Sequence, residues 1–247
     1  MKAGVKVKSV IITGADRGLG LSLCKEYLAR DYTVFAGKYL EDYSLLEDLQ
    51  ADNSSLHIIK LDVDCRVSLA AARDIVNSVT GGTLDVLISN AALMERFSCS
   101  LYEPPMDLDA VWRSFSVNAL GAARMVEFFL PLMDKSAGKR LCFVSSEVAC
   151  INLMKTSRDS GFVYPMSKSA MNMAVRIMFN QLHSQGYTFR LYHPGWMKRV
   201  MPDGSRNEEP RFDPDFTGEH AVKYFEKDLL DEHRLVMYDV LSQEWPF

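Results

Sequence analysis

The chain has 247 residues, of which 48% are hydrophobic and 24% charged, as in an ordinary soluble globular protein. Its formal net charge of −4 and its pI near 5.8 give no reason to expect nucleic acid or an anionic membrane as a partner. No apolar run is long enough to span a bilayer and no signal peptide is apparent, so we expect a soluble, cytoplasmic protein.

The cysteines and histidines point away from disulfides and metals. The cysteines are odd in number, and no two of them form a CxxC pair. The histidines are scattered, without an HExxH or similar cluster. This usage argues against a disulfide framework and a zinc site, and it fits a reducing compartment. We therefore expect no metal.

Short runs of β-type residues alternate with longer segments of helical periodicity. Strands are predicted at residues 9–13, 32–37, 56–63, 84–90, 140–146, 188–195 and 234–238. Helices are predicted at residues 20–31, 67–79, 107–133 (in two segments), 164–183 and 217–230, with a long polar loop at 196–216. This order predicts one doubly wound α/β domain over residues 1–247, a Rossmann-type parallel sheet of seven strands with helices on both faces.

A glycine-rich turn, TGADRGLG at residues 13–20, joins the first strand to the first helix. Glycine is needed where such a turn bends sharply and where a pyrophosphate approaches the backbone. The amino end of the helix then offers free N–H groups to the phosphates. The turn therefore predicts dinucleotide binding at the carboxyl ends of the strands.

The spacing of this turn, Thr-Gly-x-x-x-Gly-x-Gly, resembles the short-chain dehydrogenase/reductase family. The segments LDV, SNAA, SVNALG, VSS, YPMSK and HPG follow in the family's order and extend the resemblance over nearly the whole chain. The resemblance implies a nicotinamide cofactor. It implies these cofactor contacts: Thr13, Gly14, Asp16, Arg17, Gly18, Leu19, Gly20, Lys38, Asp62, Val63, Asn90, Ala91, Ala92, Tyr164, Lys168, Pro194, Gly195 and Trp196.

The end of the second strand bears on which nicotinamide cofactor is preferred. NAD sites usually place a carboxylate there, but this chain has Gly37 followed by Lys38. Arg17 lies inside the glycine-rich turn, and basic residues at these two places resemble the family's NADP(H)-preferring pattern. Arg17 and Lys38 would clamp a 2′-phosphate by charge-assisted hydrogen bonds, unless they are only solvated surface cations. We predict NADP(H) over NAD(H).

The resemblance also implies a catalytic set of Asn118, Ser146, Tyr164 and Lys168. A Tyr-x-x-x-Lys pair on one helix face often arises by chance, but in the family's order it implies a proton donor whose pKa the lysine lowers. Ser146 would polarise the substrate carbonyl, and it is preferred over Ser145 because the family's serine is the second of such a pair. Asn118 would hold a water that links Lys168 to solvent. The plainer alternatives are a strand-end cap for Ser146 and a mid-helix polar residue for Asn118.

Two features depart from the family's pattern. The segment between Ser146 and Tyr164 is longer by several residues, which we place in an extended loop around residues 155–160. This loop is expected to reshape the substrate pocket or to displace Ser146. The family's threonine after Pro194–Gly195 is also missing, so cofactor contact there would rely on backbone groups.

The loop at 196–216 is expected to cover the substrate, with Leu93, Met94, Trp196 and Met201 as contacts. A medium-sized apolar aldehyde or ketone is the expected substrate, and the chain looks most like the carbonyl-reductase-like branch that resembles C-factor and sniffer proteins. The main alternative is a non-catalytic NADP(H)-binding sensor on the same fold. An epimerase or dehydratase on a nucleotide sugar is disfavoured by the short carboxyl-terminal region. Family members commonly form homodimers or homotetramers, and the resemblance implies either of these here, with a monomer, as in some carbonyl-reductase-like members, as the alternative.

Overall fold

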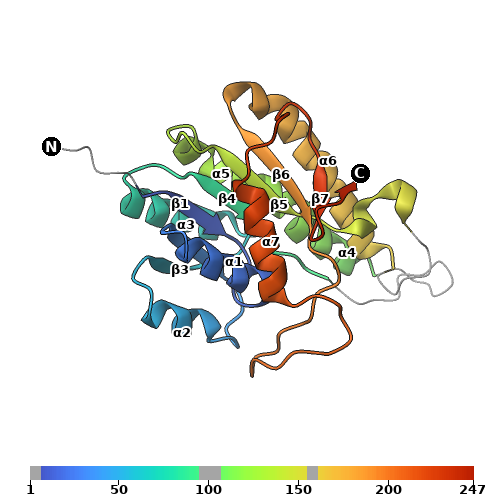
Figure 1. The fold of residues 1–247 in the computed structure, drawn as a ribbon, viewed down its shortest axis with the longest axis horizontal. Helices are drawn as coiled ribbons and strands as arrows, with labels where there is room; N and C mark the ends of the chain where they lie inside the picture. Colours follow the sequence, from blue (N-terminus) through green and yellow to red (C-terminus); the bar gives the residue numbers. More distant parts are fainter. Residues whose placement is uncertain (1–6, 95–106, 155–160) are drawn as a thin grey trace.

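One eight-stranded sheet organises the computed structural model, which describes residues 7–94, 107–154 and 161–247 (Figure 1). The strands lie in the order β3-β2-β1-β4-β5-β6-β7-β8, parallel from β3 to β7, with β8 antiparallel to β7. Their bounds are β1 (Ser9–Ile12), β2 (Thr33–Lys38), β3 (Leu56–Lys60), β4 (Val86–Ser89), β5 (Arg140–Val144), β6 (Thr188–His193), β7 (Met237–Asp239) and β8 (Glu244–Trp245).

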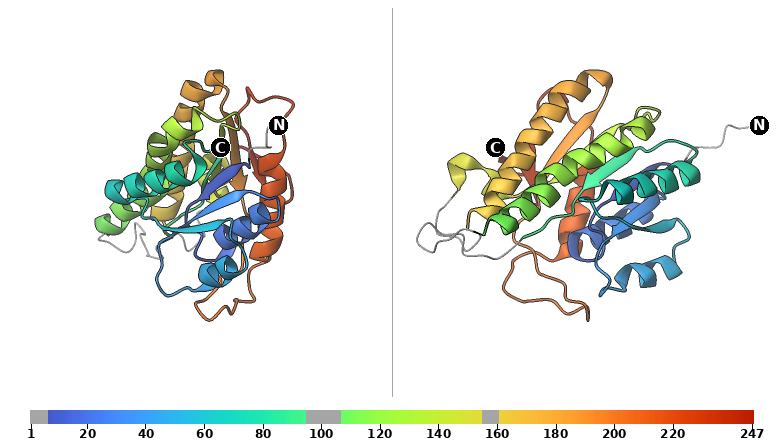
Figure 2. Two further views of the ribbon diagram at one scale, coloured as in Figure 1. Left: turned by 90° about the vertical axis from the view of Figure 1, so that its left-hand side faces the viewer. Right: turned by 180° about the vertical axis from the view of Figure 1, so that it is seen from behind.

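Helices cover both faces of this sheet, as Figure 2 shows. Their bounds are α1 (Gly18–Leu28), α2 (Leu45–Ala51), α3 (Arg66–Thr80), α4 (Leu108–Phe115), α5 (Gly121–Met133), α6 (Val163–Leu182) and α7 (Pro214–Glu226). The helices α1 and α7 pack against each other on one face, and α3, α5 and α6 cover the other. The predicted doubly wound α/β domain is therefore confirmed.

The central strand β1 shows why the sheet is covered on both sides. Val10 and Ile12 point into the core beneath α1 and α7, whereas Ile11 points into the core beneath α3 and α5. All three side chains are fully buried, so the strand is apolar over three consecutive residues after Ser9 instead of alternating with polar residues. The strand order reverses between β1 and β4, and the chain therefore leaves these two strands in opposite directions and opens a crevice at their carboxyl ends.

Four elements differ from the sequence-based expectation. The sheet has an eighth, antiparallel strand beyond the seven parallel ones, and the last predicted strand forms at β7 instead of residues 234–238. The helix α2 was not expected, because Leu46 is its one buried residue and leaves little apolar periodicity to detect. The helix α7 begins before the predicted residue 217, since the Asp213 carboxylate caps it and Pro214 occupies its first position.

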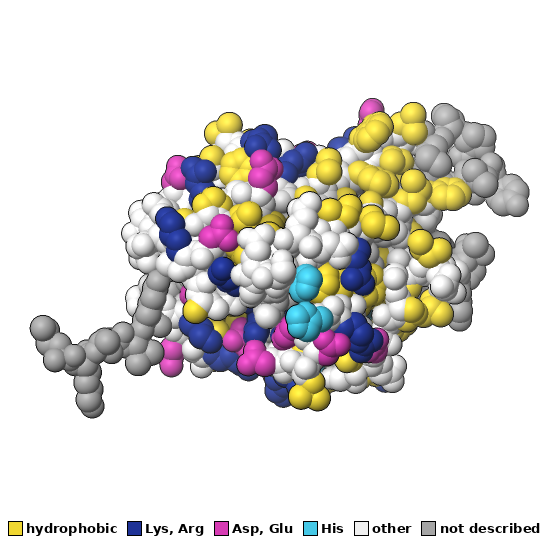
Figure 3. Space-filling model, turned by 90° about the horizontal axis from the view of Figure 1, so that it is seen from above, with side chains coloured by type: hydrophobic (Ala, Val, Ile, Leu, Met, Phe, Trp, Pro, Cys, Tyr) yellow, Lys and Arg dark blue, Asp and Glu magenta, His cyan; other side chains and the backbone are white. Residues whose placement is uncertain are grey.

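Apolar surface gathers at one end of the molecule. Seen from above, hydrophobic side chains are concentrated toward the end that carries the start of α6 (Figure 3). Exposed residues in this part of the chain include Ile151 and Leu153, in the short helical turns after β5, and Met166 in the first turns of α6. Apolar surface therefore flanks the carboxyl edge of the sheet.

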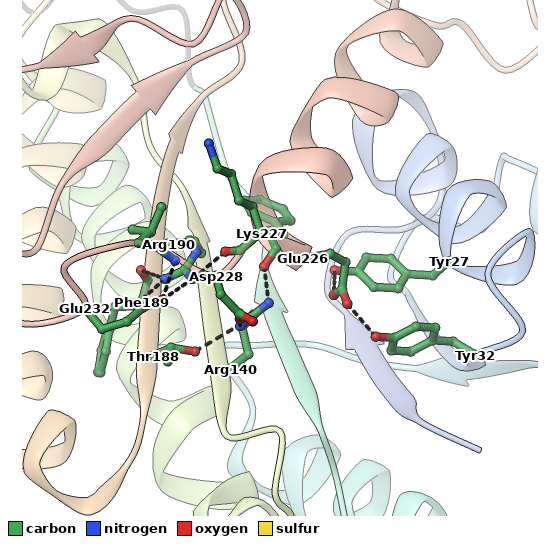
Figure 4. A network of polar contacts seen from close by, with 12 residues as sticks. Tyr27, Tyr32, Arg140, Thr188, Phe189, Arg190, Glu226, Lys227, Asp228 and Glu232 are labelled. Carbon is green, nitrogen blue, oxygen red and sulfur yellow. Dashed lines mark hydrogen bonds and ion pairs between the residues drawn. The ribbon is translucent and has the colours of Figure 1, made fainter. Parts of the chain in front are cut away.

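A buried ion pair fastens the turn between α7 and β7. Arg190, in the middle of β6, is fully buried, and its guanidinium donates to both carboxylate oxygens of Glu232 at 2.6 and 2.8 Å (Figure 4). It also donates to the Lys227 carbonyl at 2.7 Å and to the Phe189 carbonyl at 2.8 Å. These bonds hold residues 227–232 against the sheet.

Arg140 extends this network at the start of β5. Its guanidinium donates to the Phe225 carbonyl at 2.8 Å and to the Asp228 carboxylate at 2.7 Å (Figure 4). A cavity of about 600 Å³, lined in part by Arg140, Glu226 and Asp228, opens beside it. Because Arg140 marks the amino end of a parallel strand, this cavity lies at the opposite edge of the sheet from the β1–β4 crevice.

Replacement of Glu232 is expected to lower stability more than replacement of its partner Arg190. Glu232→Leu leaves a guanidinium fully buried without a counter-ion, which costs about 3–5 kcal/mol in the free energy of unfolding. Arg190→Met leaves a carboxylate whose side chain is 30% exposed, so water solvates it and the loss is smaller. Urea unfolding of both variants and of the double variant checks this. A smaller loss of stability in Glu232→Leu than in Arg190→Met would contradict this expectation.

The same pair makes stability depend on pH. Burial acts to raise the pKa of Glu232, but hydrogen bonds from Arg190 and from the Leu229 amide outweigh it and hold that pKa below its ordinary value. The stabilisation that ionised Glu232 gives the folded protein is therefore fully present above its unfolded-state pKa of ~4.3 and is lost as the pH falls below this value.

Candidate active site

The glycine-rich turn leaves the amino end of α1 open at the carboxyl edge of the sheet. A side chain at Gly20 has no space, because a Cβ there would lie 2.1 Å from the Gly14 carbonyl oxygen. Gly18 has a φ of +55°, and a Cβ built there would meet no atom of the described residues within 4 Å. No side chain of the described residues caps α1. The turn thus presents free amides and open space, which fits the pyrophosphate of a dinucleotide.

Hydrogen bonds fasten this turn to the loop after β4. The Thr13 hydroxyl accepts from the amides of Asn90 at 3.0 Å and Ala91 at 2.9 Å. The Asn90 side-chain amide donates to the carbonyls of Thr13 at 2.9 Å and Gly14 at 3.0 Å. Residues predicted to hold the cofactor after β1 and after β4 are therefore joined directly at the switch point.

The other expected cofactor residues also lie at this edge. Asp62 and Val63 follow β3, and Pro194 and Gly195 follow β6. The Asp62 carboxylate accepts from the Asp64 amide at 2.8 Å, which fixes its orientation at the end of the strand. The topology therefore brings together residues from four strand ends that are far apart in the sequence.

Lys38, at the end of β2, has a partner that the sequence did not suggest. Its ammonium pairs with the Glu47 carboxylate of α2 at 2.5 Å. The lysine charge is therefore already balanced within the protein. The predicted clamp of Arg17 and Lys38 on a 2′-phosphate would have to displace or share this carboxylate.

Tyr164 is the second residue of α6, and its phenol hydrogen-bonds the Ser146 side chain. Burial raises the pKa of Tyr164 to about 12, although the bond to Ser146 acts in the opposite direction. The Ser146 side chain thus faces Tyr164 despite the longer segment between the two residues. Residues 155–160, where we expected the extended loop, lie outside the described residues.

Lys168 lies one helical turn after Tyr164 and is 1% exposed. Its ammonium donates to the Val144 carbonyl at 2.9 Å and lies 5.9 Å from the centre of the Tyr164 ring. Burial lowers the pKa of Lys168 to about 8, since no carboxylate of the described residues pairs with it. A buried ammonium beside a phenol favours the phenolate electrostatically.

Two neighbouring serines at the end of β5 take different directions. The Ser145 hydroxyl is buried and donates to the Asn172 side chain of α6 at 2.7 Å. The Ser146 hydroxyl instead faces Tyr164 and accepts from the Val148 amide at 3.4 Å. Of these two serines, Ser146 is therefore the one that faces Tyr164, and its contact with the reacting group stays a prediction.

Asn118 lies in a π-helical turn, Ser116–Leu120, between α4 and α5. Its side chain accepts from the Leu93 amide at 2.7 Å and donates to the Leu93 carbonyl at 2.9 Å. It also donates to the Ser167 hydroxyl at 2.9 Å, and Ser167 in turn donates to the Tyr164 carbonyl at 2.8 Å. The Asn118 side chain thus ties the loop after β4 to the start of α6. Ser167 was not singled out in the sequence, because a serine within a helical pattern carries no separate signal.

The segment expected to cover the substrate, residues 196–213, folds back on itself around an antiparallel bridge between Val200 and Arg206, and we call it the hairpin. At its base, a parallel bridge joins Met197 and Phe212, with Lys198 N–H bonded to the Phe212 carbonyl at 2.8 Å. Trp196 is 62% exposed, and Met94 and Met201 are also exposed. The expected substrate contacts therefore lie on the surface at this edge, except for Leu93, whose backbone is held by Asn118.

Comparison with known proteins assigns the family. The family model described as short chain dehydrogenase matches residues 8–210. This chain belongs to the short-chain dehydrogenase family. An uncharacterized oxidoreductase of Schizosaccharomyces pombe is 30% identical over 241 residues, which cover 96% of this chain and 92% of the relative. Oxidation and reduction are therefore the general class of reaction.

Solved structures share the fold of this short-chain dehydrogenase. An NADPH-bound carbonyl reductase from chicken fatty liver superposes with a TM-score of 0.85 at 24% identity, covering 98% of this chain and all 100% of that one. The carbonyl reductase Sniffer of D. melanogaster gives a TM-score of 0.85 at 22% identity with the same coverage. Within the described part of this short-chain dehydrogenase, no helix combines the length and hydropathy needed to cross a membrane.

Proposed function

We propose that this short-chain dehydrogenase reduces an aldehyde or ketone to an alcohol with NADPH. The observation that carries the proposal is the contact of Tyr164 with Ser146, with Lys168 one helical turn away, at the sheet edge that holds the glycine-rich turn. The chicken liver carbonyl reductase, which shares the fold, has NADPH bound. Arg17, and the lack of a carboxylate at Gly37, favour the phosphorylated cofactor over NADH.

Each residue of the set has a distinct task in this reaction. When bound, the reduced nicotinamide supplies the hydride for the carbonyl carbon. The Ser146 hydroxyl donates a hydrogen bond to the carbonyl oxygen and stabilises the negative charge that develops there. The Tyr164 phenol donates its proton to the same oxygen. Lys168 then stabilises the resulting phenolate until a proton returns from solvent.

The protonation states favour the reducing direction. A Tyr164 pKa of about 12 keeps the phenol protonated at neutral pH, which is the form that an acid catalyst needs. A Lys168 pKa of about 8 keeps most of the ammonium charged under the same conditions. The free protein is thus ready to donate a proton to an alkoxide, whereas alcohol oxidation would first require the phenolate.

Apolar surface at the site suggests the kind of carbonyl compound. Met94 follows β4, Leu153 lies in the segment after β5, and Trp196 follows β6; all three are exposed. Three loops from the same sheet edge therefore offer apolar contacts, with the 196–213 hairpin as a lid. A medium-sized apolar aldehyde or ketone fits this surface better than a charged or sugar-nucleotide substrate.

Oxidation of NADPH with a panel of aldehydes and ketones tests the proposal. We expect turnover with apolar aromatic or aliphatic carbonyl compounds, with a lower KM for NADPH than for NADH. Binding of NADPH without turnover on a broad panel would instead favour the non-catalytic sensor. A clear preference for NADH would overturn the cofactor assignment.

The two serines at the end of β5 provide a matched pair of variants. Ser146→Ala removes the hydroxyl that contacts Tyr164, and we expect kcat/KM to fall by about 10²–10³-fold, as for loss of one oxyanion donor. Ser145→Ala removes a buried hydrogen bond to Asn172 and should lower stability by about 1 kcal/mol while kcat/KM changes little. Steady-state kinetics and thermal unfolding of both variants check this. The reverse order of kinetic effects would show that Ser145 is the substrate contact.

A further inference from the structure

Arg17, Tyr43 and Val200 meet at the edge of the glycine-rich turn, although they come from three separate segments. The Arg17 guanidinium lies 4.7 Å from the centre of the Tyr43 ring, and its Nη1 donates to the Tyr43 hydroxyl. That hydroxyl donates to the Val200 carbonyl at 3.2 Å, and Arg17 Nη1 lies 3.5 Å from the same oxygen. One tyrosine hydroxyl therefore links the turn to the 196–213 hairpin, which lies beside it in Figure 2.

This contact is built into the fold. Tyr43 is 5% exposed, and Val200 is buried as well. The loop that carries Tyr43 is fixed at its start, because the buried Asp16 carboxylate accepts from the amides of Tyr39 at 2.8 Å and Leu40 at 2.7 Å. The position of the Tyr43 ring is thus determined by the glycine-rich turn itself.

The contact leaves one edge of the guanidinium available. Nη1 of Arg17 is bonded to Tyr43, whereas its Nε and Nη2 make no hydrogen bond with any described residue. A guanidinium stacked on a ring and bonded at one nitrogen has lost most of its rotational freedom. The remaining donors are then ready for a bidentate contact with a phosphate, and little entropy is lost when it binds.

Lys38 cannot take this task without losing its own partner. Its ammonium is already paired with Glu47 at 2.5 Å, so a phosphate gains less from it than from the unpaired cation of Arg17. No carboxylate of the described residues forms an ion pair with Arg17. Arg17 is therefore the main determinant for a 2′-phosphate on this edge.

We propose that Tyr43 is a positioning residue that holds Arg17 for the 2′-phosphate of NADP(H) and couples that phosphate to closure of the 196–213 hairpin through the Val200 carbonyl. This inference rests on the proposed function. A phosphate bound to Arg17 holds the guanidinium in the position in which Tyr43 and Val200 are also bonded. By linkage, the closed hairpin strengthens binding of the phosphate by the same factor. NAD(H), which lacks the phosphate, does not reinforce the closed hairpin.

Limited proteolysis reads out the hairpin without any turnover. Trypsin can cleave it at Lys198, Arg199, Arg206 and Arg211. Cuts at these residues are quantified by mass spectrometry with no ligand, with NADP⁺ and with NAD⁺, each at saturation. Adenosine 2′,5′-bisphosphate and AMP serve as probes that lack the nicotinamide. We expect NADP⁺ and the bisphosphate to slow these cuts by about tenfold, and NAD⁺ and AMP to have little effect.

The variant Tyr43→Phe keeps the ring and removes only the hydroxyl. We expect it to lose the protection by NADP⁺ and the bisphosphate, and the Kd for NADP⁺ measured by calorimetry should rise about tenfold while that for NAD⁺ is unchanged. Tyr39→Phe is the matched control, since Tyr39 lies on the same loop, is 60% exposed and makes no side-chain hydrogen bond with the described residues. This control should behave as the wild type.

The outcomes separate this inference from the proposed function. Equal protection by NADP⁺ and NAD⁺ in the wild type, or full protection by NADP⁺ in Tyr43→Phe, overturns the coupling even if carbonyl reduction is observed. Protection that follows the expected pattern in a protein without carbonyl turnover supports the coupling and refutes only the reductase. Failure to bind either dinucleotide in calorimetry overturns both.

Discussion

Replacement of Tyr164 by phenylalanine is expected to lower kcat for carbonyl reduction by about 10²–10⁴-fold, the usual range for loss of a positioned general acid. The ring remains at the start of α6, so binding of NADPH should change far less than kcat. The hydrogen bond to Ser146 is lost, which lowers the free energy of unfolding by about 1 kcal/mol. Steady-state and single-turnover kinetics, together with calorimetric titration of NADPH, measure the two effects separately.

A second tyrosine provides the control for Tyr164→Phe. Tyr187 is buried before β6, and its hydroxyl donates to the Asp134 carboxylate at 2.7 Å. Tyr187→Phe therefore also removes one phenol hydrogen bond, but at the amino-terminal edge of the sheet. We expect it to lower stability and to leave kcat unchanged. Activity that survives Tyr164→Phe, or that falls equally in both variants, would refute Tyr164 as the proton donor.

The architecture could be predicted from the sequence because its signals are local. Strands such as β1 contain short apolar runs, the helices have regular periodicity, and the glycine-rich turn marks where the first strand meets the first helix. The strand β8, with two residues, and the helix α2, with one buried side chain, carry too little pattern to be recognised. Both lie at the rim of the sheet, where tertiary contacts and not propensity decide the conformation.

The candidate site, like the fold, could be predicted from the sequence only in part. The spacing of Tyr164 and Lys168 alone was compatible with chance, and the family's motif order implied a catalytic role for this pair together with Ser146 and Asn118. The contacts that fix the segments around this set were not predicted, since their partners are distant in the sequence. Asn172 holds Ser145 across 27 positions, and Tyr43 meets Val200 across 157. Such contacts arise from the fold and leave no periodic trace in the chain.

Burial of the Lys168 ammonium lowers the stability of the fold, although the proposed reaction needs this group. Its ammonium is buried with a carbonyl and no described carboxylate as partner, so the folded protein holds a charge that water would solvate better. Burial lowers the pKa from 10.5 to about 8. This difference corresponds to a destabilisation on the order of 3 kcal/mol in the charged form. Strain of this kind is retained at functional sites when the reaction depends on it.

Lys168→Met is therefore expected to abolish carbonyl reduction and yet to leave the cofactor-free protein at least as stable as the wild type at pH 7. Methionine fills a similar volume without the charge, and the lost bond to the Val144 carbonyl offsets only part of the gain, about 1–2 kcal/mol. Urea unfolding at pH 7 and the NADPH oxidation assay measure both effects. A variant that is inactive and strongly destabilised would show that the ammonium is a structural group.

The pH dependence of stability distinguishes a lowered lysine pKa from other causes. Between pH 8 and 10.5 the unfolded chain binds more protons at Lys168 than the folded one, so this residue's contribution to stability increases as the pH rises through that window and is constant below it. Burial raises the pKa of Cys142 and Cys150, which acts in the opposite direction at similar pH. The difference between the wild-type and Lys168→Met curves removes those common terms. We expect the wild type to gain stability relative to Lys168→Met as the pH rises from 8 to 10. A difference in stability that does not change with pH would mean that Lys168 keeps an ordinary pKa in the folded protein.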